Sequence, residues 1–134
     1  MARKESGIKL SSVKEAEKYK IGAVRDDVGE QLVEAGGINK EKLSLGVSGE
    51  SLAKMLAAKR IDLLAYEENV VNWNLKKSNL NPGDFEVVFV LKKSELYYAL
   101  HKDSDAAAVK ELQQALDAVK KSAEYSAIMK KYLH

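Results

Sequence analysis

Two short polar clusters stand where the sequence predicts that strands end. The first cluster is Arg25, Asp26 and Asp27, and the second is Tyr66 and Glu67. A guanidinium and several carboxylates in such places can hold a charged or strongly polar small molecule. In open α/β sheets, ligands bind beyond the carboxyl ends of the strands, where backbone N–H groups of the following helices also point. The two clusters together therefore predict a ligand site.

Each residue of the clusters also has a structural interpretation. Asp27 stands three residues before Glu30, which is the spacing of a capping box, so an N-cap role is its simpler interpretation. Glu68 suits a helix N-terminus electrostatically. Glu67 stands at the very end of its strand, and a binding role and a structural role are equally supported for this residue. The same balance holds for Arg25, which could be a surface ion-pair partner.

Other kinds of chemistry are excluded or unsupported by the sequence. Cysteine is absent, so there is no disulfide, thiol nucleophile or Cys-ligated zinc. Two histidines, His101 and His134, are too few for a histidine metal cluster. The glycines fit neither a P-loop nor a dinucleotide fingerprint, and no Gly-x-Ser-x-Gly elbow occurs. We therefore expect a protein that is not an enzyme and that has no metal or cofactor.

The composition indicates one globular domain and argues against polyanionic partners. The chain has 134 residues, of which 46% are apolar and 31% charged. Its 22 basic and 20 acidic residues give a net charge of +2, too small to indicate binding to nucleic acid or to an anionic membrane. The first 20 residues lack the apolar run of a signal peptide.

Apolar runs that alternate with helical patterns predict the elements that position the clusters. We expect strands at 20–24, 43–47, 61–66, 85–91 and 96–100. We expect helices at 28–35, 49–59 and 68–78, with Ser48 as the N-cap of the second. Such alternation is typical of an α/β fold, in which a mainly parallel sheet is flanked by helices.

Two amphipathic helices are expected after Ser104, with a break near Ser122. Their apolar stripes are Val109, Leu112, Leu116 and Val119, followed by Tyr125, Ile128, Met129, Tyr132 and Leu133. The expected division of the chain is a lead-in over 1–18, a lobe over 19–101 and a helical segment over 102–134. The bare stripes suggest pairing with a second copy of the chain, so a homodimer through these helices is one expected partnership.

Three stretches, taken in order, resemble the family 3 extracellular solute-binding proteins, the receptors of polar amino-acid ABC transporters. They are 12–32, 55–67 and 96–132. The resemblance implies one lobe of a type II periplasmic-binding-protein-like fold, namely the second lobe and the C-terminal segment. It also implies a periplasmic or extracytoplasmic location, a small polar solute such as an amino acid as ligand, and a first lobe and an ABC permease as partners.

The resemblance assigns roles to the polar clusters. Arg25 matches a position that often contacts the ligand side chain, and the loop from Asp26 to Gly29 matches one that offers N–H groups to the ligand carboxylate. Tyr66 and Glu67 match positions where an acidic residue holds the α-ammonium. Members commonly have Gly and Ser or Thr where Asp26 and Asp27 stand. Two carboxylates there repel a ligand carboxylate, so an amine-like ligand is the alternative.

Two other functions use the same fold and stay open. One is a periplasmic dehydratase-like enzyme, for which Glu67 is the candidate general acid. The other is the sensory module of a receptor kinase. The sequence does not decide among transport, catalysis and signalling.

Overall fold

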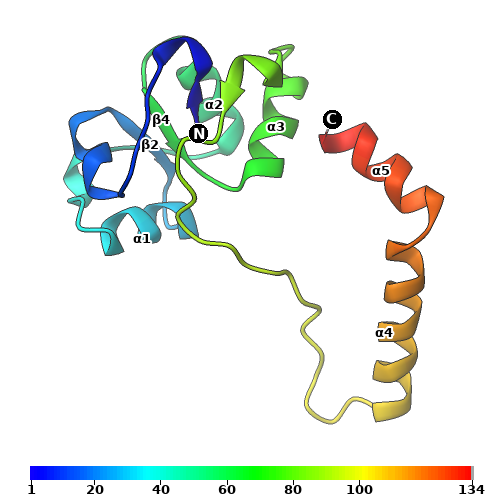
Figure 1. Cartoon of the computed structure of the whole chain (residues 1–134). Helices are drawn as coiled ribbons and strands as arrows, with labels where there is room; N and C mark the ends of the chain where they lie inside the picture. The colour runs from blue at the N-terminus through cyan, green and yellow to red at the C-terminus, as the bar shows by residue number, and fades with distance from the viewer. Residues whose placement is uncertain (134) are drawn as a thin grey trace. The chain divides into compact units, whose positions relative to one another are not determined.

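The structure is a computed structural model, and it describes residues 1–133. Residue contacts divide the chain into two compact units, Met1–Lys93 and the remainder from Ser94. The first unit carries the sheet and the helices α1, α2 and α3, and the second carries α4 and α5 (Figure 1).

The first unit is built on three parallel strands. They are β2 (Ile21–Val24), β3 (Leu43–Gly46) and β4 (Leu63–Ala65). Two short antiparallel strands complete the sheet, β1 (Ala2–Arg3) and β5 (Phe85–Glu86), and the strand order is β3-β2-β4-β1-β5. The predicted α/β class is confirmed, with a parallel centre and an antiparallel edge.

The crossover helices lie on opposite faces of this sheet. They are α1 (Val28–Ala35), α2 (Gly49–Ala57) and α3 (Glu68–Lys77). Since β3 and β4 flank β2 on opposite sides, right-handed crossovers place α1 and α2 on opposite faces.

Two separate core clusters confirm this arrangement. Val33 of α1 packs with Ile21 and Leu63, whereas Leu52 of α2 packs with Leu64, which points to the other face of β4.

The first residues of the chain belong to the sheet. Arg3 of β1 is almost fully buried, and its Nη1 donates hydrogen bonds to the carbonyl oxygens of Leu56 and Ile61, the latter at 2.9 Å. The guanidinium thereby satisfies a carbonyl in the last turn of α2. No strand was predicted within 1–18, because two residues of which one is charged give no alternating pattern.

The predictions of long strands at 85–91 and 96–100 are wrong. Only Phe85 and Glu86 join the sheet, and residues 87–100 form no ladder. The apolar run has a different cause, because Val88 and Leu91 pack against the core cluster on the α1 face. In contrast, Leu96 is fully exposed. Apolar and β-branched residues favour extended backbone, but a strand also needs a neighbour with which to pair.

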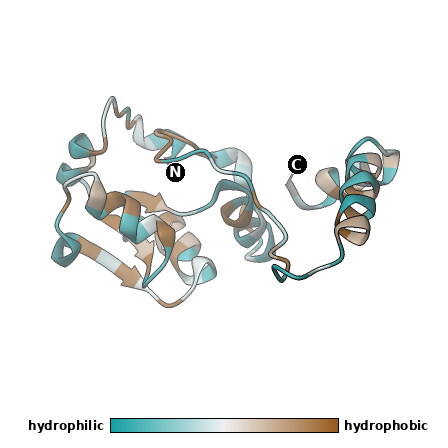
Figure 2. Ribbon diagram, turned by 90° about the horizontal axis from the view of Figure 1, so that it is seen from below, coloured by the Kyte–Doolittle hydropathy of each residue, from teal (hydrophilic) through white to brown (hydrophobic). Residues whose placement is uncertain are grey.

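The second unit consists of α4 (Ala106–Lys120) and α5 (Ala123–Leu133), which confirms the two C-terminal helices. The N-cap of α4 is Asp105, whose side chain accepts the N–H of Ala107, and not the expected Ser104. None of the described residues from Ser94 onward is buried. Hydrophobic colouring is dense on the strands of the first unit and interrupted along these helices (Figure 2). Over residues 1–133, no helix is both long and apolar enough to span a membrane.

Candidate functional site

The carboxyl ends of β2, β3 and β4 lie at one edge of the sheet. Ala23 of β2 pairs with Ala65 of β4, so the loops after these two strands leave the sheet side by side. On the other side of β2, the N–H of Arg25 donates to the carbonyl of Gly46 at 3.0 Å. The predicted clusters around Arg25 and Tyr66 are therefore brought to neighbouring loops, as the parallel topology requires.

Gly29 sets how closely the two loops approach. A Cβ at Gly29 would lie 2.4 Å from the carbonyl oxygen of Ala65, so only glycine lets the first turn of α1 reach the end of β4. This contact places Asp27 near the segment that carries Tyr66 and Glu67. We refer to Arg25, Asp26, Asp27, Gly29, Tyr66 and Glu67 together as the polar edge.

Each helix that begins at this edge has a side-chain N-cap. Asp27 accepts the N–H of Gly29 at 3.4 Å, and Glu67 accepts that of Val70 at 2.7 Å. Ser48 similarly caps α2. The structural interpretation of Asp27 is thus confirmed, and Glu67 has a structural role as well. Because side chains already occupy these helix N-termini, they offer fewer N–H groups to an anion.

Glu30 departs from the expected capping box. Its carboxylate accepts the N–H of Asp26 instead of that of Asp27, and it lies 2.5 Å from the ammonium of Lys40. The side chain is buried, and the hydrogen bond from Lys40 is the main cause that lowers the pKa of Glu30. Lys40 was not predicted as a partner, since it follows a turn ten residues later and no local spacing links the two.

The pair of Glu30 and Lys40 holds the loop after β2 in shape. Asp26 has φ of 59°, in the left-handed region that aspartate tolerates better than most residues. The hydrogen bond to Glu30 fixes the N–H of Asp26 in that conformation. The side chain of Asp26 stays exposed, beside the exposed Arg25.

Tyr66 is half-buried, and its ring packs against the start of α2. A Cβ at Gly49 would lie 2.6 Å from Cε1 of Tyr66 and 2.7 Å from Nδ2 of Asn74. Gly49 and Asn74 thus lie against Tyr66, next to the polar edge, although no sequence pattern indicated them. The only sequence signal that could have indicated this close packing was Gly49 itself, a glycine between the predicted N-cap Ser48 and the rest of the predicted helix.

The charges at the polar edge are unbalanced. Four carboxylates lie in the polar edge or directly beside it: Asp26, Asp27, Glu67 and Glu68. Arg25 stands among them, Lys40 interacts with Asp26 but is already paired with Glu30, and the amino group of Met1 interacts with Glu68, so negative charge is in excess. Such an arrangement attracts a cationic group and repels an anionic one. Among residues 1–133, no three His, Asp or Glu side chains come together as a metal site.

The fold has a known counterpart. No protein-family model and no curated protein matches the sequence. Among solved structures, it is similar to a histidine kinase sensor domain with similarity to periplasmic binding proteins, with a TM-score of 0.63 and 19% sequence identity. The match covers 98% of this chain but only 56% of the sensor-domain chain. The likeness confirms a periplasmic-binding-protein-like α/β fold.

Proposed function

We propose that this chain is a ligand-binding lobe of an extracytoplasmic sensory receptor, and that its ligand is a small polar solute with an amine group. The observation that carries the proposal is the polar edge itself, at the carboxyl ends of three parallel strands in a fold of the periplasmic-binding-protein type. Ligands of such folds bind where strand ends and helix starts converge, and the polar edge offers that geometry.

The charge of the polar edge supports the amine. The carboxylates of Asp27 and Glu67 are held in place by backbone N–H donors, so they need no rearrangement to receive an ammonium group. A ligand carboxylate would meet these two charges and would find the N–H groups of Gly29 and Val70 already taken. Arg25 remains as the group that contacts a polar or anionic part of the solute.

A sensory role is favoured over transport by the similar structure, which is described as a kinase sensor domain. Transport as an ABC-receptor lobe is the second candidate, because three stretches in order resemble the family 3 solute-binding proteins. In either role the opposite wall of the cleft would come from a second lobe. A kinase segment encoded downstream would support sensing, and a neighbouring pair of permease and ATPase genes would support transport.

We also propose that the lobe is not catalytic. A dehydratase would need Glu67 as a general acid that delivers a proton to its substrate. Oε2 of Glu67 instead accepts the N–H of Val70 at 2.7 Å, so this oxygen caps α3 rather than facing a substrate as a proton donor.

The proposal is tested by titrating the chain with putrescine, acetate and alanine while backbone amide resonances are recorded by NMR. We expect putrescine to shift resonances at 25–29 and 66–68, with a dissociation constant in the range of about 1 mM because one lobe supplies only half of the contacts. Glu67→Gln should weaken this binding. The control Glu41→Gln removes an exposed carboxylate from another part of the unit and should have no effect.

A further variant, Asp27→Ser, separates capping from charge. Serine still caps the helix, so stability should be retained while putrescine binding weakens and acetate binding improves. If acetate binds the polar edge of the unmodified chain as well as putrescine does, the proposed ligand class is wrong.

A further inference from the structure

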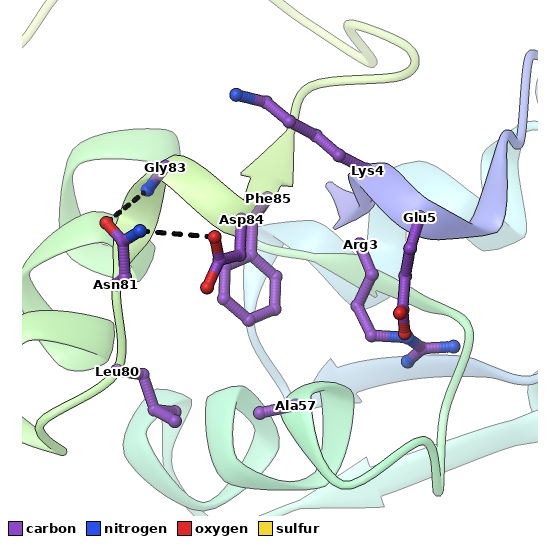
Figure 3. A pocket seen from close by; sticks show the side chains of 9 residues that line it. All are labelled: Arg3, Lys4, Glu5, Ala57, Leu80, Asn81, Gly83, Asp84 and Phe85. Atoms are coloured by element: carbon purple, nitrogen blue, oxygen red, sulfur yellow. Dashed lines mark hydrogen bonds and ion pairs between the residues drawn. The ribbon is translucent and has the colours of Figure 1, made fainter.

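A hollow lies at the opposite end of β4 from the polar edge. It has a volume of about 480 Å³, within the size range of small-molecule sites. Its walls come from the start of the chain, from the C-terminal end of α2 and from the turn Pro82–Asp84 that precedes β5. Figure 3 shows Arg3 and Glu5 on one side of the hollow, and Asn81 and Asp84 on another.

One wall is basic and rigidly held. Two backbone carbonyls fix the guanidinium of Arg3, as described above, while its buried Nε makes no hydrogen bond to any residue between 1 and 133. The carboxylate of Glu5 lies 3.5 Å from this Nε but is also bound by Lys59 at 2.8 Å. Lys4 is exposed, and no described residue forms an ion pair with it. The guanidinium is also paired with Asp62, whose Oδ1 lies 3.7 Å from Nη2 of Arg3, so the cation that this wall offers to a ligand is the ammonium group of Lys4.

Another wall is acidic. Oδ1 of Asp84 accepts a hydrogen bond from the amide of Asn81 at 3.1 Å, and that amide's oxygen accepts the N–H of Gly83 at 3.0 Å. Within the described part of the chain, Asp84 has no cationic partner. The carboxylate is thus oriented by neutral groups and keeps its charge for a ligand.

The remaining lining is apolar. Phe85 is buried in the α2-face core, and Leu80 and Ala57 pack partly against the same cluster. An apolar surface between two walls of opposite charge suits a molecule that has an apolar body and two charged ends. A simple anion or a simple cation would use only one of the walls.

We propose that this hollow binds a small zwitterion, with its carboxylate at the ammonium group of Lys4, its ammonium at Asp84, and its apolar body against Phe85 and Leu80. The site is distinct from the polar edge, because Arg3 contacts the carbonyl of Ile61 before β4 begins, whereas Glu67 follows the end of β4. The two sites can therefore be tested independently.

L-Leucine is a suitable probe, with isocaproate and isoamylamine as analogues that each lack one of its charges. We expect leucine to shift amide resonances at 3–5, 57 and 80–85. Each analogue should bind about tenfold more weakly or worse, since each loses one charge-assisted interaction. Lys4→Gln and Asp84→Asn should weaken leucine binding similarly, and the control Lys9→Gln, an exposed lysine outside the lining, should not.

Three results would overturn the proposal. The first is no resonance shift at the hollow with leucine up to about 10 mM. The second is equal binding of leucine and isocaproate, which would show that Asp84 contributes nothing. The third is a loss of the shifts at the hollow in Glu67→Gln, which would place the leucine at the polar edge. Retention of those shifts in Glu67→Gln supports the second site whether or not amines bind the polar edge.

Discussion

Single carboxylates at the starts of helices serve the structure and, in the proposed function, would serve the ligand as well. Asp27 and Glu67 each accept a backbone N–H, which keeps their negative charge in a fixed place near the positive end of a helix dipole. Their exposure to solvent differs, since Asp27 is half-buried and Glu67 is exposed. Under the proposed function, each of these caps would both stabilise the fold and select a cation.

Glu17 gives a prediction about acid stability. Hydrogen bonds from the ammonium groups of Lys42 and Lys14, at 2.7 and 2.9 Å, lower its pKa to about 2. Since this carboxyl has an ordinary pKa of 4.5 when unfolded, its contribution to stability is complete above about pH 4.5 and is lost as the pH falls toward 2. Urea unfolding of Glu17→Gln should therefore show a weaker decline in midpoint between pH 5 and pH 2 than the unmodified chain.

The matched control for this experiment is Glu41→Gln. Glu41 is exposed, and no described residue forms an ion pair with it, so its removal should leave the pH dependence as it is. An unchanged decline in Glu17→Gln would contradict the role assigned to Lys42 and Lys14.

At the scale of residues, local sequence patterns predicted those interactions that form between residues close in sequence. The N-caps Asp27 and Ser48 followed from spacing alone, because a cap bonds only two or three residues ahead. The partnership of Glu30 with Lys40 and the burial of Arg3 depend on contacts between distant segments. No pattern within one segment carries that information.

At the scale of elements, the approach of α1 to β4 depends on one glycine. We predict that Gly29→Ala lowers the free energy of unfolding by about 1–3 kcal/mol, because the added Cβ meets the backbone carbonyl of Ala65, which cannot move aside as a side chain can. Equilibrium urea unfolding measures this loss. The substitution Gly29→Ala should also shift the amide resonances of Tyr66 and Glu67.

Gln31→Ala is the control for this change. Gln31 is exposed in the same helix, so its substitution should alter the unfolding free energy by no more than about 0.5 kcal/mol. Equal midpoints for Gly29→Ala and the unmodified chain would show that α1 can move away from β4 without cost.

The crossover elements were predictable, and the edge of the sheet was not. The parallel strands β2 and β4 are mostly buried and β3 is partly buried, so their apolar runs are distinct from the helical patterns between them. The strand β1 has two residues, too few for a period of two to be visible, and of the strand expected at 85–91 only the two residues of β5 pair in the sheet. The expected strand at 96–100 shows the opposite case, since its sequence favours extended backbone and no strand pairs with it there.

At the scale of the whole molecule, the first unit has its own core and the second has none. Both core clusters consist of residues before Lys93. We predict that a chain ending at Lys93 unfolds cooperatively in urea and keeps the dispersed amide spectrum of the first unit. A peptide of residues 94–134 should show little helix by circular dichroism, because helices of 15 and 11 residues without a buried face are marginal in water.

Loss of cooperative unfolding in the chain ending at Lys93 would show that the C-terminal helices supply core contacts to the first unit. Strong helicity of the isolated peptide would instead indicate self-association. Dilution of the peptide tests for self-association, since only a self-associated helix loses its structure as the concentration falls.

The position of β1 in the sheet also has a consequence for folding kinetics. β1 lies between β4 and β5, and Ala2 pairs with both Leu63 and Glu86. β1 must therefore wait for β5, which is far from it in sequence, before the sheet is complete. Loops of this length close slowly compared with helix formation, and such high contact order slows folding. The nascent chain is thus exposed to proteases and chaperones until the segment up to Glu86 has been made.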